Sequence, residues 1–208
     1  MKKLALLLSV VVLCVPIWSQ SLDVPRRTVL DDAGAEPNPW AQTLVEAIRR
    51  AAKADIAFLG AAFFSSETIQ PGRASLDDLA KGFSFAEDEI ATLNLTGAQI
   101  RQAIERSLEL YPQKWNSFLQ LSGATVSFAM EGDKAKISSI KVGRDLLLDE
   151  KTYVVATSAP LARGALGYFR IWDKNQITKT LNENCLEALK LYLSDNPRWM
   201  AEPAYIKN

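Results

Sequence analysis

Capped helices alternate with short apolar strands over most of this chain, and that alternation restricts the fold more than any other feature. Asn38 followed by Pro39 is typical of a helix start, and apolar residues then recur on one face of residues 39–52. Two pairs with the spacing of a capping box open further helices: Ser75 with Asp78, and Thr96 with Gln99. We therefore expect at least three helices with defined starts.

Apolar runs between these helices predict buried strands, at residues 55–60, 89–95 and 152–157. A further pair of strands, 124–130 and 136–142, flanks the turn EGDK and predicts an antiparallel hairpin. Apolar residues from Leu181 to Tyr192 predict a helix near the C-terminus. The fold class is a mixed α/β or α+β domain.

The first residues predict export. Lys2 and Lys3 precede a long apolar run, and small residues precede a cleavage site ahead of Leu22, so residues 1–21 have the organisation of a signal peptide. Lipid attachment at Cys14 is the less favoured alternative, because a bulky leucine precedes that cysteine. We expect a periplasmic or extracellular protein, and no later stretch approaches the ~20 apolar residues of a membrane span.

The remaining chain divides into two parts. Residues 22–37 contain proline, glycine and charge without a sustained period, which predicts a mobile or peripheral lead-in, and residues 38–208 form the domain itself. Cys185 would be the one cysteine left after cleavage, so no intrachain disulfide is expected and a buried, unreactive thiol is favoured.

Composition excludes several function classes. The chain contains no histidine, so it can form neither a Ser/His/Asp triad, nor a Cys/His pair, nor a histidine-bearing dinuclear metal centre by itself. Lys and Arg together number 24, as do Asp and Glu, which gives no basic footprint for nucleic acid. The acidic run at 87–89 is expected to be a solvated turn, because consecutive carboxylates point in different directions. We expect no metal site, no cofactor and no catalytic residue.

Four segments in order resemble the C-terminal domain of the 5′-nucleotidase family. They are ADIAFL at 54–59, LTGAQI at 95–100, FLQLSG at 118–123, and the long tail IKVGRDLLLDEKTYVVATSAPLARGALGY at 140–168. The resemblance covers nearly the whole domain and implies a layered sandwich of helices and mixed sheets. It also implies that a metallophosphoesterase domain, absent from this sequence, performs the chemistry, while the C-terminal domain recognises the nucleoside.

The resemblance implies a first group of ligand contacts around two turns. Where the family has an arginine after the first strand, this chain has Ser65, and Arg73 could reach the same region or could be an ordinary surface arginine. The family's base-stacking aromatic corresponds to a segment in which Phe85 stands either for that ring or for the proline before it.

The loop TSAPLARGALGY, residues 157–168, supplies the second group. In the family's pattern a phenylalanine stands where this chain has Pro160, and an aspartate where it has Leu166. Ser158, Gly164 and Tyr168 complete the candidate ligand contacts, although a backbone role for the glycine and a core position for Tyr168 are favoured. The scaffold is retained and the nucleotide site is eroded.

Three hypotheses follow from these residues. The chain is the recognition or accessory half of a nucleotide-hydrolysing phosphoesterase system, completed by a separate metallophosphoesterase subunit; or a binding protein for a different small ligand; or a protein-interaction domain whose cleft is filled. The first is preferred because the order of the motifs is retained, and it predicts that the chain alone does not hydrolyse nucleotides.

Overall fold

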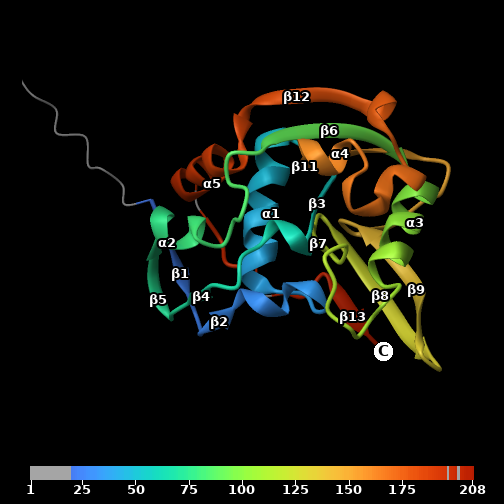
Figure 1. Ribbon diagram of the computed structural model, residues 1–208, viewed down its shortest axis with the longest axis horizontal. Helices are drawn as coiled ribbons and strands as arrows, with labels where there is room; N and C mark the ends of the chain where they lie inside the picture. The colour runs from blue at the N-terminus through green and yellow to red at the C-terminus, as the bar shows by residue number, and fades with distance from the viewer. Residues whose placement is uncertain (1–19, 196, 201) are drawn as a thin grey trace, which may run out of the picture.

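The computed structural model describes residues 20–195, 197–200 and 202–208, and Figure 1 shows their arrangement. Residues 1–19 of the predicted signal peptide, including Cys14, lie outside the described residues. The last two residues of that predicted peptide, Gln20 and Ser21, are described. Among the described residues, none of the helices is long and apolar enough to cross a membrane. The elements form a mixed α/β fold in which helices and a second sheet pack on a central sheet.

The central sheet has five strands, in the order β12-β6-β11-β3-β7. These strands span Ile177–Asn184, Glu89–Thr96, Thr152–Ser158, Ile56–Gly60 and Leu119–Ser122. The pair β11 and β3 is parallel, and the other neighbours are antiparallel. The predictions for β3, β6 and β11 are confirmed to within about two residues at each end.

One face of the sheet is covered by α1 (Pro39–Ala52) and α5 (Cys185–Ser194), which also pack on each other (Figure 1). The Asn38 side chain caps α1 by accepting hydrogen bonds from the backbone N–H groups of Trp40 and Ala41, as the sequence predicted. The thiol of Cys185 is buried, and desolvation raises its pKa, which agrees with an unreactive cysteine.

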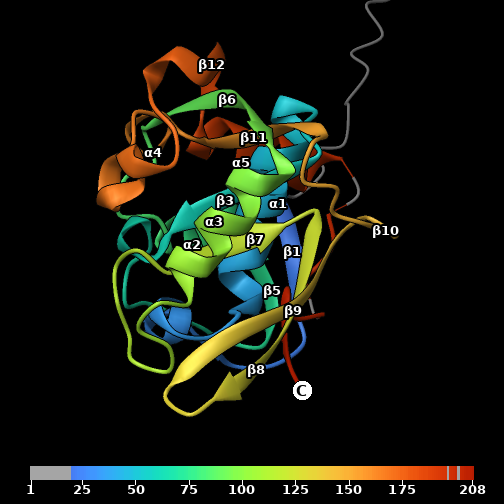
Figure 2. The same cartoon turned by 90° about the vertical axis from the view of Figure 1, so that its right-hand side faces the viewer.

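The opposite face is covered by α3 (Gly97–Ser107) and a second sheet in the order β10-β9-β8-β13. Figure 2 shows α3 lying across β3 and β7, with the β8 and β9 hairpin beside it. The hairpin strands span Ala124–Glu131 and Lys134–Val142, and the edge strands span Asp145–Leu146 and Tyr205–Lys207. Both predicted capping boxes are present, the first opening the short helix α2 (Leu76–Ala80).

The predicted peripheral position of residues 22–37 is wrong. β1 (Ser21–Val24) pairs antiparallel with β5 (Gly72–Ser75), and β2 (Thr28–Val29) pairs with β4 (Thr68–Ile69). The helical turn η1 (Leu30–Gly34) follows. Leu22, Val24 and Leu30 are buried in the core, so hydrophobic burial holds a segment that lacks helical or strand periodicity.

The position expected for Leu181 is also wrong. Leu181 lies on strand β12 at the edge of the central sheet, and the last helix begins only at Cys185, where Asn184 provides the cap. Leu181 still packs into the same core as that helix, which explains why it fitted the apolar pattern.

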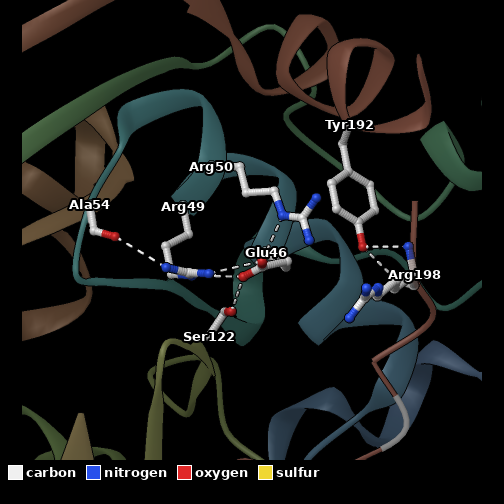
Figure 3. Close-up of polar contacts among 7 residues, drawn as sticks. All are labelled: Glu46, Arg49, Arg50, Ala54, Ser122, Tyr192 and Arg198. Atoms are coloured by element: carbon white, nitrogen blue, oxygen red, sulfur yellow. Dashed lines mark hydrogen bonds and ion pairs between the residues drawn. The ribbon is translucent and has the colours of Figure 1, made fainter. Parts of the chain in front are cut away.

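A buried carboxylate ties α1 to the sheet, as Figure 3 shows. Glu46 has a side chain only 5% exposed and accepts hydrogen bonds from Arg49, Arg50 and the hydroxyl of Ser122 on β7. Burial alone would raise the pKa of Glu46, but the hydrogen bonds from Arg49, Ser122 and Arg50 outweigh it, so its pKa is lowered. We call these four residues the Glu46 cluster.

Candidate functional site

A cavity of about 450 Å³ opens at the carboxyl ends of the parallel strands β3 and β11. Because parallel neighbours end at the same edge of a sheet, the segments that follow them enclose a common space, which is where open α/β sheets bind ligands. Gly60 closes β3 and leads into the helical turn η2 (Ala61–Phe63), and Ser158 closes β11 and leads into the short helix α4 (Ala159–Ala162). The turn before β6 forms the third wall.

The cavity is apolar apart from two side chains. Asp88 and Ser158 provide polar atoms, and the remaining lining residues are Gly60, Ala62, Phe63, Phe85, Pro160, Leu161, Ala165 and Leu166. We call this space the apolar cavity. Burial raises the pKa of the Asp88 carboxyl, and the charge of Arg163 offsets only part of that effect.

Leu166 narrows the cavity from an unusual backbone position. Its φ of 58° and ψ of 22° lie in the left-handed region, which costs a residue with a Cβ about 1–2 kcal/mol. A Cβ built on Gly60 would lie 2.2 Å from Cδ1 of Leu166, so the leucine side chain occupies the space that this glycine leaves open. The two residues therefore depend on each other's size.

Arg106 of α3 holds the loop around Leu166. Its Nη2 donates a 2.7 Å hydrogen bond to the Leu166 carbonyl oxygen, and the hydroxyl of Ser117 donates to the same oxygen at 3.0 Å. The guanidinium carbon lies 5.4 Å from the ring centres of both Trp115 and Tyr168. An arginine fixed between two rings gives the loop a rigid support.

Comparison with known proteins shows which family the domain belongs to. The family model described as 5′-nucleotidase, C-terminal domain, matches residues 21–172 of this chain. The chain belongs to this family. No curated protein shows a significant match to the sequence.

Solved structures of 5′-nucleotidases share the fold of the domain at low sequence identity. The 5′-nucleotidase precursor from Thermus thermophilus has a TM-score of 0.76 at 17% identity, and NAD nucleotidase from Haemophilus influenzae has 0.76 at 15%. A putative 5′-nucleotidase from Staphylococcus aureus, in complex with alpha-ketoglutarate, has 0.71 at 17%. The alignments cover 89%, 91% and 91% of this chain but only 39%, 38% and 41% of those proteins, so this 5′-nucleotidase C-terminal domain spans about two fifths of their length.

Two of the five residues suggested by the resemblance line the apolar cavity. Phe85 is 54% exposed and stands at the cavity with its ring centre 6.2 Å from that of Phe63. Ser158 is 4% exposed at the end of β11, and its side chain makes no capping hydrogen bond to α4. Two of the three positions in which this chain departs from the family pattern, Pro160 and Leu166, line the same cavity, whereas the third, Ser65, does not.

The other three lie away from the cavity wall. Arg73 is exposed on β5 opposite Asp23, which agrees with an ordinary surface arginine. Gly164 has a φ of 91°, and a Cβ there would lie 2.7 Å from the backbone of Phe169, so its role is conformational.

Tyr168 is part of the core. It has no exposed surface, its hydroxyl donates a 2.7 Å hydrogen bond to the carbonyl of Ser117, and its ring stacks on Trp172 with centres 4.8 Å apart. Desolvation raises the pKa of its hydroxyl well above the usual value. Phe118 and Phe128 are buried in the same cluster, and Trp115 packs against it.

Ser65 supports a turn beside a second, polar cavity of about 460 Å³. Its hydroxyl donates a 2.6 Å hydrogen bond to the carbonyl of Lys81, and its backbone N–H donates to the carbonyl of Gly82. Residues of the polar cavity include Ser66, Ser84 and Asn116. Within the described part of the chain, no group of His, Cys, Asp and Glu side chains has a geometry that could hold a metal ion.

Sequence reasoning missed the small residues of the cavity wall. Gly60, Ala62 and Ala165 contribute little chemistry of their own, so no motif singles them out. A usable signal was nevertheless present, because the residues that directly follow two parallel strands meet at one edge. Using that signal requires knowing that β3 and β11 are parallel neighbours, and this pairing joins segments that lie far apart in the sequence.

Proposed function

We propose that this chain is the exported recognition or accessory half of a nucleotide-hydrolysing phosphoesterase system. In this role the domain holds the organic part of a phosphate ester, and a separate metallophosphoesterase subunit, a possible partner in the same compartment, cleaves the ester. The observation that carries the proposal is the cavity at the carboxyl ends of β3 and β11. Four of the positions that the family pattern assigns to the ligand site line it: Phe85, Ser158, Pro160 and Leu166.

The proposal of a separate catalytic subunit rests on the family resemblance and on the histidine content of this sequence. The solved relatives are more than twice as long as the aligned domain. The present sequence contains no histidine, which the metal centre of the catalytic domain would require under the resemblance. These residues alone would not supply metal-dependent chemistry on a phosphate ester, which the proposal assigns to a separate subunit.

A second candidate is a stand-alone binding protein for another small ligand, and the apolar lining favours it. Pro160 and Leu166 replace the stacking and polar contacts expected for a nucleoside. The third hypothesis predicted a filled cleft, and the open cavity of about 450 Å³ gives it no support.

Partner-dependent hydrolysis tests the proposal. The chain is mixed with histidine-bearing metallophosphoesterases encoded in the same genome, and kcat/KM is measured on nucleoside monophosphates with and without the chain. We expect no hydrolysis by the chain alone and a lower KM in one pairing. The variant Ala62→Trp, which fills the cavity, should remove that gain, whereas Ala135→Trp on the distant β9 should keep it. Metal-dependent hydrolysis by the chain alone would refute the proposal that recognition and catalysis belong to separate subunits.

Ligand recognition is tested separately by thermal unfolding in the presence of nucleosides and nucleotides. A ligand present at 100 times its dissociation constant stabilises the folded state by ~2.7 kcal/mol, which shifts the unfolding midpoint of a domain this size by about 5–11 °C. A shift that Ala62→Trp abolishes would support the cavity as the binding site. Equal shifts in the variant and the native chain would place the ligand elsewhere.

A further inference from the structure

We propose that the apolar cavity selects an uncharged, apolar ligand group that carries a hydrogen-bond donor, and discriminates against anionic groups. The inference rests on the proposed function in one respect, namely that the cavity is a recognition site. It goes further by naming the chemical class of the ligand group that the cavity takes. The volume of the apolar cavity, about 450 Å³, falls in the usual range of small-molecule sites, about 300–1,000 Å³.

The lining supplies no positive charge. No lysine or arginine is among the lining residues, and Asp88 is the one ionisable group there. An anionic group placed in the cavity would lose its hydration without gaining a cation, and it would meet the Asp88 carboxylate. Apolar groups, by contrast, would bury their surface against Phe63, Leu161 and Leu166.

The two polar lining groups are suited to a ligand that donates a hydrogen bond. An ionised carboxylate is an acceptor only, so Asp88 requires a donor from whatever it contacts. Two ionisable groups face Asp88 from neighbouring elements. Arg163, exposed at the end of α4, acts on Asp88 through its positive charge, and the Cys185 thiol at the start of α5 has a pKa raised by its own burial and by the charge of Asp88. The hydroxyl of Ser158 can accept or donate, which leaves the donor requirement of Asp88 as the selective feature.

Leu166 is the specificity-determining residue of this arrangement. Its carbonyl oxygen is fixed by Arg106 and Ser117, so its side chain is held against Gly60 and inside the cavity. The position therefore presents methyl groups to a ligand rather than a hydrogen-bonding side chain. Arg106 contributes as a positioning residue, because it contacts the loop backbone and is not one of the residues that line the cavity.

Two matched fluorescent probes test the inference with the full chain. N-phenyl-1-naphthylamine is uncharged, is built from aromatic rings and donates one N–H, and 8-anilino-1-naphthalenesulfonate is the same skeleton with a sulfonate. We expect saturable binding of the amine at one site, and binding of the sulfonate weaker by at least about tenfold. Substituting Asp88→Asn should reduce that ratio by at least about threefold, because it removes the repulsion and leaves the cavity apolar.

The site is assigned with paired variants. Ala62→Trp and Ala165→Trp fill the cavity from two different walls and should each abolish binding of the amine, whereas Ala135→Trp should not. Unfolding midpoints show which variants are folded. If only one of the two cavity variants folds, that variant alone is enough to assign the site. Leu166→Asp should weaken the amine several-fold by making the wall polar.

Three outcomes would overturn the inference. These are binding of the sulfonate as tightly as the amine, retention of amine binding in the folded cavity variants, and stabilisation of the native chain by adenosine but not by the amine. The last result would leave the proposed function intact, since a nucleoside would then occupy the recognition site. Conversely, amine binding without any partner-dependent hydrolysis would leave the ligand class standing and refute the phosphoesterase role.

Discussion

The Glu46 cluster and the apolar cavity shift the pKa of a carboxyl group in opposite directions. Glu46 is more deeply buried than Asp88, yet Arg49, Arg50 and Ser122 satisfy it, and its pKa is lowered. Asp88 is less buried, and its pKa is raised because burial outweighs the charge of Arg163. Burial by itself therefore does not decide whether a carboxylate stabilises the fold; its hydrogen-bonding partners do.

The difference separates a structural region from the proposed recognition site. The Glu46 carboxylate accepts hydrogen bonds from α1 and β7, so the cluster links a helix to an edge strand of the sheet, and Arg49 also donates to the carbonyl of Ala54. The apolar cavity contains a partly desolvated acceptor and a leucine in the left-handed region. Unfavourable local features of this kind persist where the surroundings hold them in place, and they concentrate at ligand sites.

Breaking the Glu46 cluster should have the largest effect. Glu46→Gln removes the negative charge and places an amide N–H₂ group among arginine donors, so we expect a loss of about 2–3 kcal/mol in the free energy of unfolding. Urea denaturation measures it. Glu105→Gln on the exposed face of α3 is the matched control and should change stability by less than about 0.5 kcal/mol. A similar small change for Glu46→Gln would remove the structural role assigned to the cluster.

Introducing the residues of the family pattern at positions 160 and 166 tests the apolar cavity, as Glu46→Gln tests the Glu46 cluster. The double variant Pro160→Phe with Leu166→Asp supplies a ring and a polar group, and aspartate tolerates the left-handed region better than leucine. A stacking contact is worth about 1–3 kcal/mol. Adenosine should then bind at least about tenfold more tightly than to the native chain, measured by calorimetry.

Two outcomes separate the causes of any such gain. Leu166→Asp alone tests the polar contact without the ring, and it should recover only part of the affinity. If the folded double variant binds adenosine no better than the native chain, the residues at positions 160 and 166 do not determine adenosine affinity.

Acid should weaken the fold through Glu46. Because its folded pKa is lowered below the ordinary value of 4.5, its contribution to stability is fully present above that value and is lost as pH falls through the folded pKa. Denaturation curves from pH 6 to pH 3 should show a smaller loss of stability for Glu46→Gln than for the native chain. Parallel pH profiles of the two proteins would contradict the lowered pKa.

Local signals predicted the elements that are determined locally. The caps at Asn38, Ser75 and Thr96 each open a helix, because a side-chain acceptor and the orphan N–H groups of a first turn lie within three residues of one another. The hairpin of β8 and β9 was equally readable from its alternation and short turn.

Elements fixed by distant partners were not predictable in this way. β1 is a strand because β5 lies beside it, and Leu181 is on a strand because β12 pairs with β6. The same limit applied to the site, where Phe85 and Ser158 were predicted through a family pattern, but the small residues Gly60 and Ala62 join the wall only once β3 and β11 are known to be parallel. Register and pairing depend on contacts that no short window of sequence contains.

Asp88→Asn is expected to have the smallest effect on stability of these variants. Its folded pKa is raised, so the folded state binds a proton more readily than the unfolded state, and ionised Asp88 weakens the fold as pH rises through the folded pKa. Asp88→Asn should therefore raise the unfolding midpoint slightly at pH 7 and have little effect near pH 3. This is the reverse of the expectation for Glu46→Gln, which lowers the midpoint at pH 7. A lower midpoint for Asp88→Asn at neutral pH would mean that the carboxylate has a stabilising partner, and the donor requirement inferred for the ligand would fall with it.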